Sequence, residues 1–102
     1  MKIKYNSGYL METATHYVDN NQLVYSLNTE LEPKYKYESG QRTDTIDGYS
    51  AWFSQKSVEP FKVKFSEEIT LPKYMTVVQF EKLQAVEVNY NVFCKADGIK
   101  NI

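Results

Sequence analysis

The clearest alternation of apolar and polar positions lies just past the middle of the chain. Phe61, Val63 and Phe65 fall on one face of an extended strand, and Lys62 and Lys64 fall on the other. Such a strand buries its apolar face and leaves its polar face in water. We therefore expect the three apolar side chains in a core and the two lysines outside.

Other strands are predicted where β-branched, aromatic and aliphatic residues lie between turn signals, at residues 15–18, 23–27, 34–37, 49–55, 76–80, 83–88 and 90–96. The first two of these runs are joined by Asp19-Asn20-Asn21, so they predict an early hairpin. Helix is favoured only at Tyr9–Thr15 and, more weakly, at Gln79–Leu83, since Pro, Gly and β-branched residues interrupt longer windows.

This pattern predicts one all-β domain over residues 1–102. The six to eight short strands suit a small OB-like barrel with an extra N-terminal hairpin and little helix. An SH3-like barrel and a small sandwich are the structural alternatives. A length of 102 residues with 42% hydrophobic residues is typical of one globular domain with a modest core.

Positive charge is concentrated in the middle third of the chain. The whole protein carries a formal net charge of −1 at pH 7. Residues 33–64 hold six basic side chains against four acidic ones, whereas the segments before and after them are net negative. The same middle segment is rich in aromatic residues, so a local basic-aromatic surface is predicted despite the acidic total.

Alternation within residues 34–37 separates two kinds of side chain. Tyr35 and Tyr37 share one face of the predicted strand, and Lys34 and Lys36 share the other. Rings beside cations suit single-stranded nucleic acid, because bases stack on the rings and phosphates contact the cations. The candidates for stacking are Tyr35, Tyr37, Tyr49 and Trp52, and those for phosphate contact are Lys34, Lys36, Arg42, Lys62 and Lys64. Tyrosine is also common in strands for structural reasons, an interpretation equally open for any one of them.

Signatures of enzymes are scarce. His16 is the lone histidine, Cys94 is the lone cysteine, and Asp44 and Asp47 are the nearest approach to a carboxylate pair. Each is more simply explained as a surface, core or turn residue. We expect a protein without enzymatic activity, cofactor or metal. A single cysteine favours a reducing cytoplasm, and neither a signal peptide nor a membrane span is expected.

A resemblance to known proteins covers the chain from residue 33 onward. It is carried by the segments 33–37, 40–49, 60–65 and 91–100. These resemble small OB-fold-like single-stranded DNA-binding or conjugation-associated proteins of bacterial mobile elements, namely phages, plasmids and conjugative transposons. The resemblance implies an OB-like barrel and a role beside single-stranded DNA in replication or transfer.

The preferred hypothesis is non-sequence-specific binding of single-stranded DNA, with replication or conjugation proteins as further partners. A homodimer is expected too, since joining two grooves raises affinity. The main alternative is a protein-interaction adaptor or inhibitor that uses the same exposed rings as hot spots. A structural phage component is a weaker third hypothesis.

Overall fold

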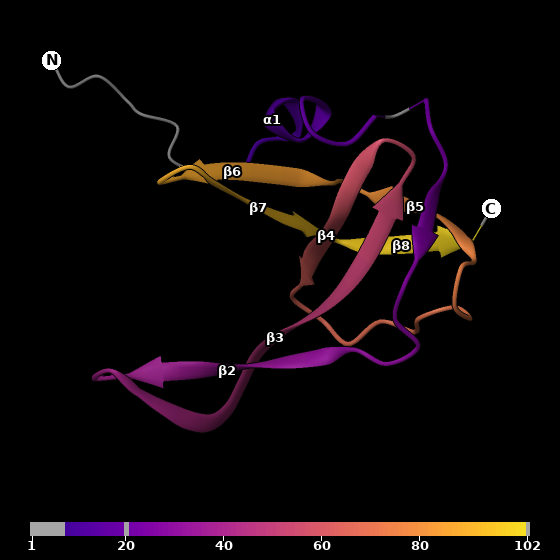
Figure 1. The fold of residues 1–102 in the computed structure, drawn as a ribbon. Coiled ribbons are helices and arrows are strands. Elements are labelled where there is room, and N and C mark those ends of the chain that lie inside the picture. The colour runs from indigo at the N-terminus through magenta and orange to yellow at the C-terminus, as the bar shows by residue number, and fades with distance from the viewer. Residues whose placement is uncertain (1–7, 20, 102) are drawn as a thin grey trace, which may run out of the picture.

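The computed structural model describes residues 8–19 and 21–101, which form a small barrel of strands with one short helix (Figure 1). The elements are α1 (Met11–Thr15), β1 (Val24–Ser26), β2 (Glu32–Glu38), β3 (Gln41–Gln55), β4 (Val58–Phe65), β5 (Val77–Glu81), β6 (Gln84–Val88), β7 (Asn91–Ala96) and β8 (Gly98–Asn101).

The strands pair in a closed circuit. β1 pairs with both β3 and β5, β3 pairs with β4, and β4 runs parallel to β7. β5 continues into β6, β7 continues into β8, and these two long segments pair with each other. At the break between them the backbone N–H of Asp97 donates to the carbonyl of Glu81 at 2.8 Å. The result is a five-stranded Greek-key barrel of the OB type, which confirms the predicted fold class.

The barrel interior is filled by alternate residues of β3 and β4, as their pattern predicts. Phe53, Val63 and Phe65 are fully buried. The Phe53 ring lies 4.8 Å from the ring of Phe80 and 6.2 Å from that of Phe65, measured between centroids. Phe61 is only partly buried at the margin of this cluster. Burial of these rings supplies much of the hydrophobic stabilisation of so small a domain.

The N-terminal part of the fold differs from the prediction. The hairpin expected from residues 15–18 and 23–27 is absent, because the first run ends a helix and β1 pairs instead with β3 and β5. Ala14 and Val18, four residues apart, both turn into the core, and the Val18 N–H donates to the Ala14 carbonyl at 2.9 Å. The helical spacing of Ala14 and Val18 therefore outweighed the strand propensity of residues 15–18. The short helix predicted at Tyr9–Thr15 is confirmed by α1.

Two further differences lie near the C-terminal end. The weaker helix expected at Gln79–Leu83 is wrong, because residues 77–81 form β5 and pair with β8. β8 itself was not predicted, since the turn signal Asp97-Gly98 masks a strand that continues directly from β7. Lys82, between β5 and β6, has a φ of +53°. This conformation lets the β5–β6 segment bend at the level where β7 passes into β8.

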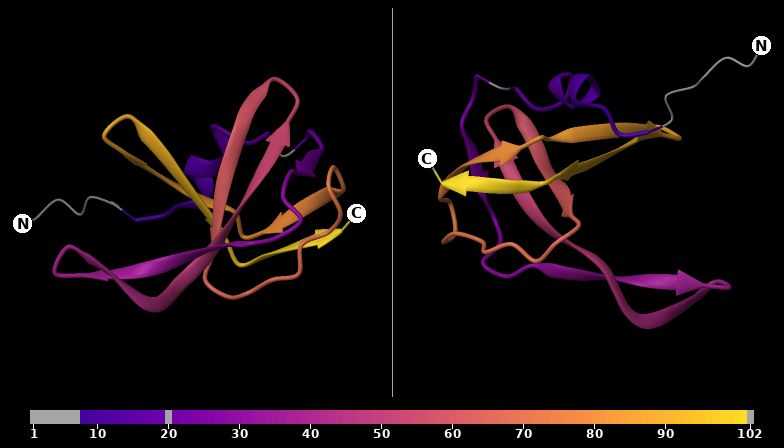
Figure 2. Two further views of the ribbon diagram at one scale, coloured as in Figure 1. Left: turned by 60° about the horizontal axis from the view of Figure 1, so that its bottom comes forward. Right: turned by 180° about the vertical axis from the view of Figure 1, so that it is seen from behind.

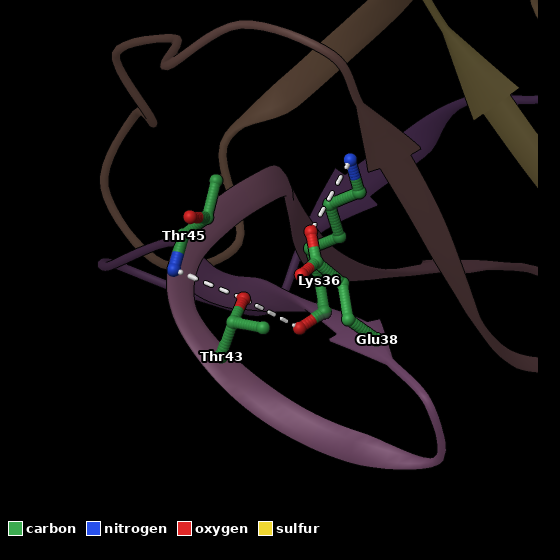
Figure 3. Close-up of polar contacts among 4 residues, drawn as sticks. All are labelled: Lys36, Glu38, Thr43 and Thr45. Atoms are coloured by element: carbon green, nitrogen blue, oxygen red, sulfur yellow. Dashed lines mark hydrogen bonds and ion pairs between the residues drawn. The ribbon is translucent and has the colours of Figure 1, made fainter.

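β2 and the first half of β3 form an arm that extends beyond the barrel (Figure 1). Its tip is a two-residue turn in which Ser39 and Gly40 both have positive φ, 52° and 77°. The pairing shifts register twice along the arm. At one shift Thr43 Oγ1 donates to the Lys36 carbonyl at 2.7 Å and accepts the Thr45 N–H at 3.2 Å (Figure 3). The extra residues on β3 twist the arm away from the barrel wall.

Gly48 occupies the bulge where the arm joins the barrel, and its replacement by alanine is expected to destabilise the fold. Its φ is +134°, and a Cβ there would lie 2.9 Å from Lys64 Cε and 3.0 Å from the Phe65 carbonyl oxygen. We expect Gly48→Ala to lower the free energy of unfolding by more than about 1 kcal/mol in urea denaturation. Gly8→Ala is the control, because nothing lies within 4 Å of a Cβ at Gly8. Equal stability of the two variants would contradict this account of the bulge.

Candidate nucleic-acid interface

A groove of about 820 Å³ runs over the outer face of β3 and β4. Two hairpins flank it, the β2–β3 arm and the β6–β7 hairpin, which project from the same side of the barrel in all three views (Figures 1 and 2). The groove is lined by Tyr9, Tyr17, Val18, Lys34, Ser50, Trp52, residues 57–62, Lys64 and residues 92–94. In OB barrels this face and its flanking loops usually bind oligonucleotides or oligosaccharides.

One wall of the groove is cationic. Lys34 comes from β2, and Lys62 and Lys64 come from the outward face of β4. The pKa of Lys34 lies below the usual lysine value, first because a hydrogen bond from Lys62 favours the neutral amine of Lys34, and then because of partial burial and repulsion by Lys62 and Lys64, which Glu32 partly offsets. All three lysines line the same groove, so they concentrate positive charge along this wall.

Trp52 lies beside this wall. It is directly opposite Lys62 in the β3–β4 ladder, and Lys62 Nζ lies 5.8 Å from the centroid of its ring. The Trp52 side chain remains 38% exposed. Lys62 also forms an ion pair with Glu32, with 3.4 Å between Nζ and Oε2. A partly exposed indole beside a lysine can contact a base and its phosphate together.

The other wall is apolar and aromatic, and sequence reasoning missed it. It is formed by Tyr9, Tyr17, Val92 and Phe93. Phe93 is 49% exposed, and no role is predicted for it from the sequence. Alternation with the buried Cys94 could have placed Phe93 outside. The groove therefore has cations on one side and exposed apolar rings on the other.

Polar contacts hold the tyrosines of this second wall. The Tyr17 hydroxyl donates to Glu87 Oε2 at 2.7 Å. The carboxylate raises the pKa of Tyr17 above its usual value, through this hydrogen bond first. Lys95 Nζ lies 4.6 Å from the centroid of the Tyr9 ring, and Lys95 is directly opposite Lys64 in the β4–β7 ladder. A fourth cation therefore lies near the lysine wall.

The chain matches no protein-family model, no curated protein and no solved structure. What it binds is therefore inferred from the groove itself. Within residues 8–19 and 21–101, no group of three or more His, Cys, Asp or Glu side chains is placed to hold a metal ion. No helix in these same ranges has the length and apolar character needed to cross a bilayer.

The nine residues predicted for nucleic-acid binding are divided among three places. The groove brings together Lys34, Trp52, Lys62 and Lys64. The arm carries Tyr35, Lys36, Tyr37 and Arg42. Tyr49 lies on the other face of β3, where it borders a second hollow of about 420 Å³. Four of the nine predicted residues therefore lie together in one groove, and five lie outside it.

On the arm, the aromatic and charged side chains largely contact one another. The Arg42 guanidinium carbon lies 4.3 Å from the centroid of the Tyr35 ring, so the guanidinium group covers one face of that ring. Lys36 Nζ lies 3.9 Å from Glu38 Oε1 on the exposed surface (Figure 3). Tyr37, 66% exposed, is the freest ring of the arm. The arm therefore offers fewer available contacts than the groove.

The two residues with catalytic potential occupy ordinary environments. His16 is exposed just after α1, and its backbone N–H donates to the Thr13 carbonyl at 3.2 Å. Cys94 is a free, buried cysteine at the groove floor, and burial raises the pKa of its thiol. A raised pKa keeps the thiol neutral and makes it a poor nucleophile.

Proposed function

We propose that the protein binds single-stranded DNA, without sequence preference, in the groove over β3 and β4. The observation that carries this proposal is the alignment of Trp52, Lys62 and Lys64 on one outward face between two projecting hairpins. Stacking and phosphate contact are the two interactions that sequence-independent recognition of a single strand requires.

Each wall of the groove suits one part of a nucleotide. Bases contact Trp52 and the apolar wall around Phe93, and the sugar-phosphate backbone follows the lysines of β2 and β4. Unstacked bases are available only in a single strand, whereas a duplex presents its phosphates and hides its ring faces. The aromatic content of the groove therefore favours a single strand over a duplex.

For the cellular setting we extend the resemblance to proteins of bacterial mobile elements that the sequence predicts from residue 33 onward. We place the protein in the cytoplasm, beside single-stranded DNA during replication or transfer of such an element. The free thiol of Cys94 suits a reducing compartment.

Fluorescence of Trp52, the one tryptophan of the chain, provides the direct test. Titration with a thymidine oligonucleotide is expected to quench this fluorescence to saturation. If the three groove lysines each contact one phosphate, the logarithm of the binding constant falls with the logarithm of salt concentration with a slope of about −2. No binding at low salt, for DNA or RNA strands, would reject the proposal.

A protein-interaction module is the second candidate, and the β6–β7 hairpin favours it. Tyr90 at its tip is fully exposed, and Val88 and Val92 beside it are 45% and 37% exposed. Exposed aromatic and aliphatic side chains at a tip are typical of protein contacts. Saturable binding that hardly depends on salt would favour this function over DNA binding.

A further inference from the structure

One buried hydroxyl at the groove lacks a hydrogen-bond partner. Ser50 is 1% exposed and lines the groove, and its Oγ neither donates nor accepts a hydrogen bond within the described part of the chain. Every other buried side-chain nitrogen or oxygen among those residues has a partner. A buried hydroxyl without a partner is costly and calls for an explanation.

The surroundings of Ser50 show what it could bind. In the ladder it lies directly opposite Lys64 on β4 and Glu32 on β2. Lys34 and Lys62 line the same groove, and their mutual repulsion is evident in the lowered pKa of Lys34. Three cations that line one groove with a free hydroxyl donor offer a set of ligands for an anion with several oxygen atoms.

We propose that Ser50 is the base of a phosphate subsite, in which its hydroxyl donates to a phosphate oxygen held by Lys34, Lys62 and Lys64. This rests on the proposed function, because the phosphate is one of the bound strand. It is either an internal phosphodiester or the phosphomonoester at an end. Bound phosphate satisfies the Ser50 hydroxyl and relieves the repulsion among the lysines together.

Glu32 occupies part of this subsite in the free protein. Its carboxylate pairs with Lys62 Nζ at 3.4 Å, and both side chains are partly exposed. A phosphate that takes Lys62 must displace this carboxylate or accept its repulsion. Removing the charge of Glu32 therefore strengthens phosphate binding, the opposite of what loss of a merely structural ion pair would do.

The test compares Ser50→Ala and Glu32→Gln with the unchanged protein, using a labelled thymidine oligonucleotide with or without a 5′-phosphate. Ser50→Ala is expected to weaken binding about ten-fold, as loss of a hydrogen bond to a charged group does. Glu32→Gln is expected to strengthen it about two- to five-fold. Ser54→Ala is the matched control, because Ser54 lies on the same strand but outside the groove.

The two oligonucleotides identify the source of the phosphate. If Ser50→Ala weakens binding only of the oligonucleotide with a 5′-phosphate, the subsite holds the terminal phosphate. If it weakens binding of both oligonucleotides equally, the subsite holds an internal phosphodiester. Ser50→Ala binding equal to that of Ser54→Ala would overturn the subsite while leaving the proposed function intact.

Inorganic phosphate separates the two proposals in the other direction. It is added to the unchanged protein and followed by the NMR shifts of the Ser50 and Lys64 amides. Saturable shifts that Ser50→Ala abolishes support the subsite, even if no oligonucleotide binds and the proposed function fails. Amides that do not shift with inorganic phosphate would reject the subsite, whether or not an oligonucleotide binds.

Discussion

Phe53→Ala is expected to lower the free energy of unfolding by about 3–5 kcal/mol, the usual cost of emptying a phenylalanine site in a packed core. Phe53 is fully buried, and its ring contacts the rings of Phe61, Phe65 and Phe80 within centroid distances of 4.8 to 6.4 Å. These rings come from β3, β4 and β5. The cavity therefore opens where three strands of the barrel meet, and neighbouring backbone cannot easily collapse into it.

Urea denaturation measures this loss, and Phe93→Ala is the matched control. Phe93 is the same residue type on β7, but it is 49% exposed and faces the groove. We expect its replacement to change stability by no more than about 0.5 kcal/mol. If the two variants lost similar stability, the barrel interior would not be packed around Phe53 as described.

The barrel strands were predictable because their signal is local. Each buried residue in β4 has an exposed or partly exposed neighbour, so a period of two distinguishes Val63 and Phe65 from Lys62 and Lys64 without knowledge of the partner strands. The same rule puts Trp52 outside and Ala51 inside once one face of β3 is known to be buried. These assignments are confirmed by the structure.

The N-terminal segment was not predictable in this way, because two patterns overlap there. Thr15 to Val18 has the β-branched and aromatic residues of a strand, while Ala14 and Val18 have helical spacing. Packing of α1 against β6 decides between them, and Leu10 secures the helix start by pairing with Ala85. That partner lies far away in the sequence, so no local rule could identify it.

The composition of the groove depends on non-local pairing as well. Val92 and Phe93 reach the groove only because β7 runs parallel to β4, with Cys94 opposite Val63. The alternation of β3 equally left open which face of this strand is interior. Tyr49 shares its face with Ala51, so burial of that face directs it away from the groove. From the sequence alone, an aromatic residue of β3 that faces the groove cannot be distinguished from one that faces away from it, as Tyr49 does.

Trp52→Ala is expected to lower the affinity for a thymidine oligonucleotide about ten- to a hundred-fold, since stacking of one base contributes about 1–3 kcal/mol. Because the variant lacks its fluorescent reporter, anisotropy of a labelled oligonucleotide is the measurement. Tyr74→Ala is the control, as Tyr74 is 63% exposed in the segment between β4 and β5 and does not line the groove. Its affinity is expected to equal that of the unchanged protein.

The salt dependence of these variants separates stacking from charge. Trp52 carries no charge, so Trp52→Ala shifts the whole salt titration to weaker binding and leaves its slope unchanged. Lys64→Ala removes one phosphate contact, so it reduces the magnitude of the slope by about 0.7. Equal affinities of Trp52→Ala and Tyr74→Ala would mean that the Trp52 indole does not contact the oligonucleotide. An unchanged slope in Lys64→Ala would instead mean that Lys64 contacts no phosphate, and the apolar wall around Phe93 would then point to a protein partner.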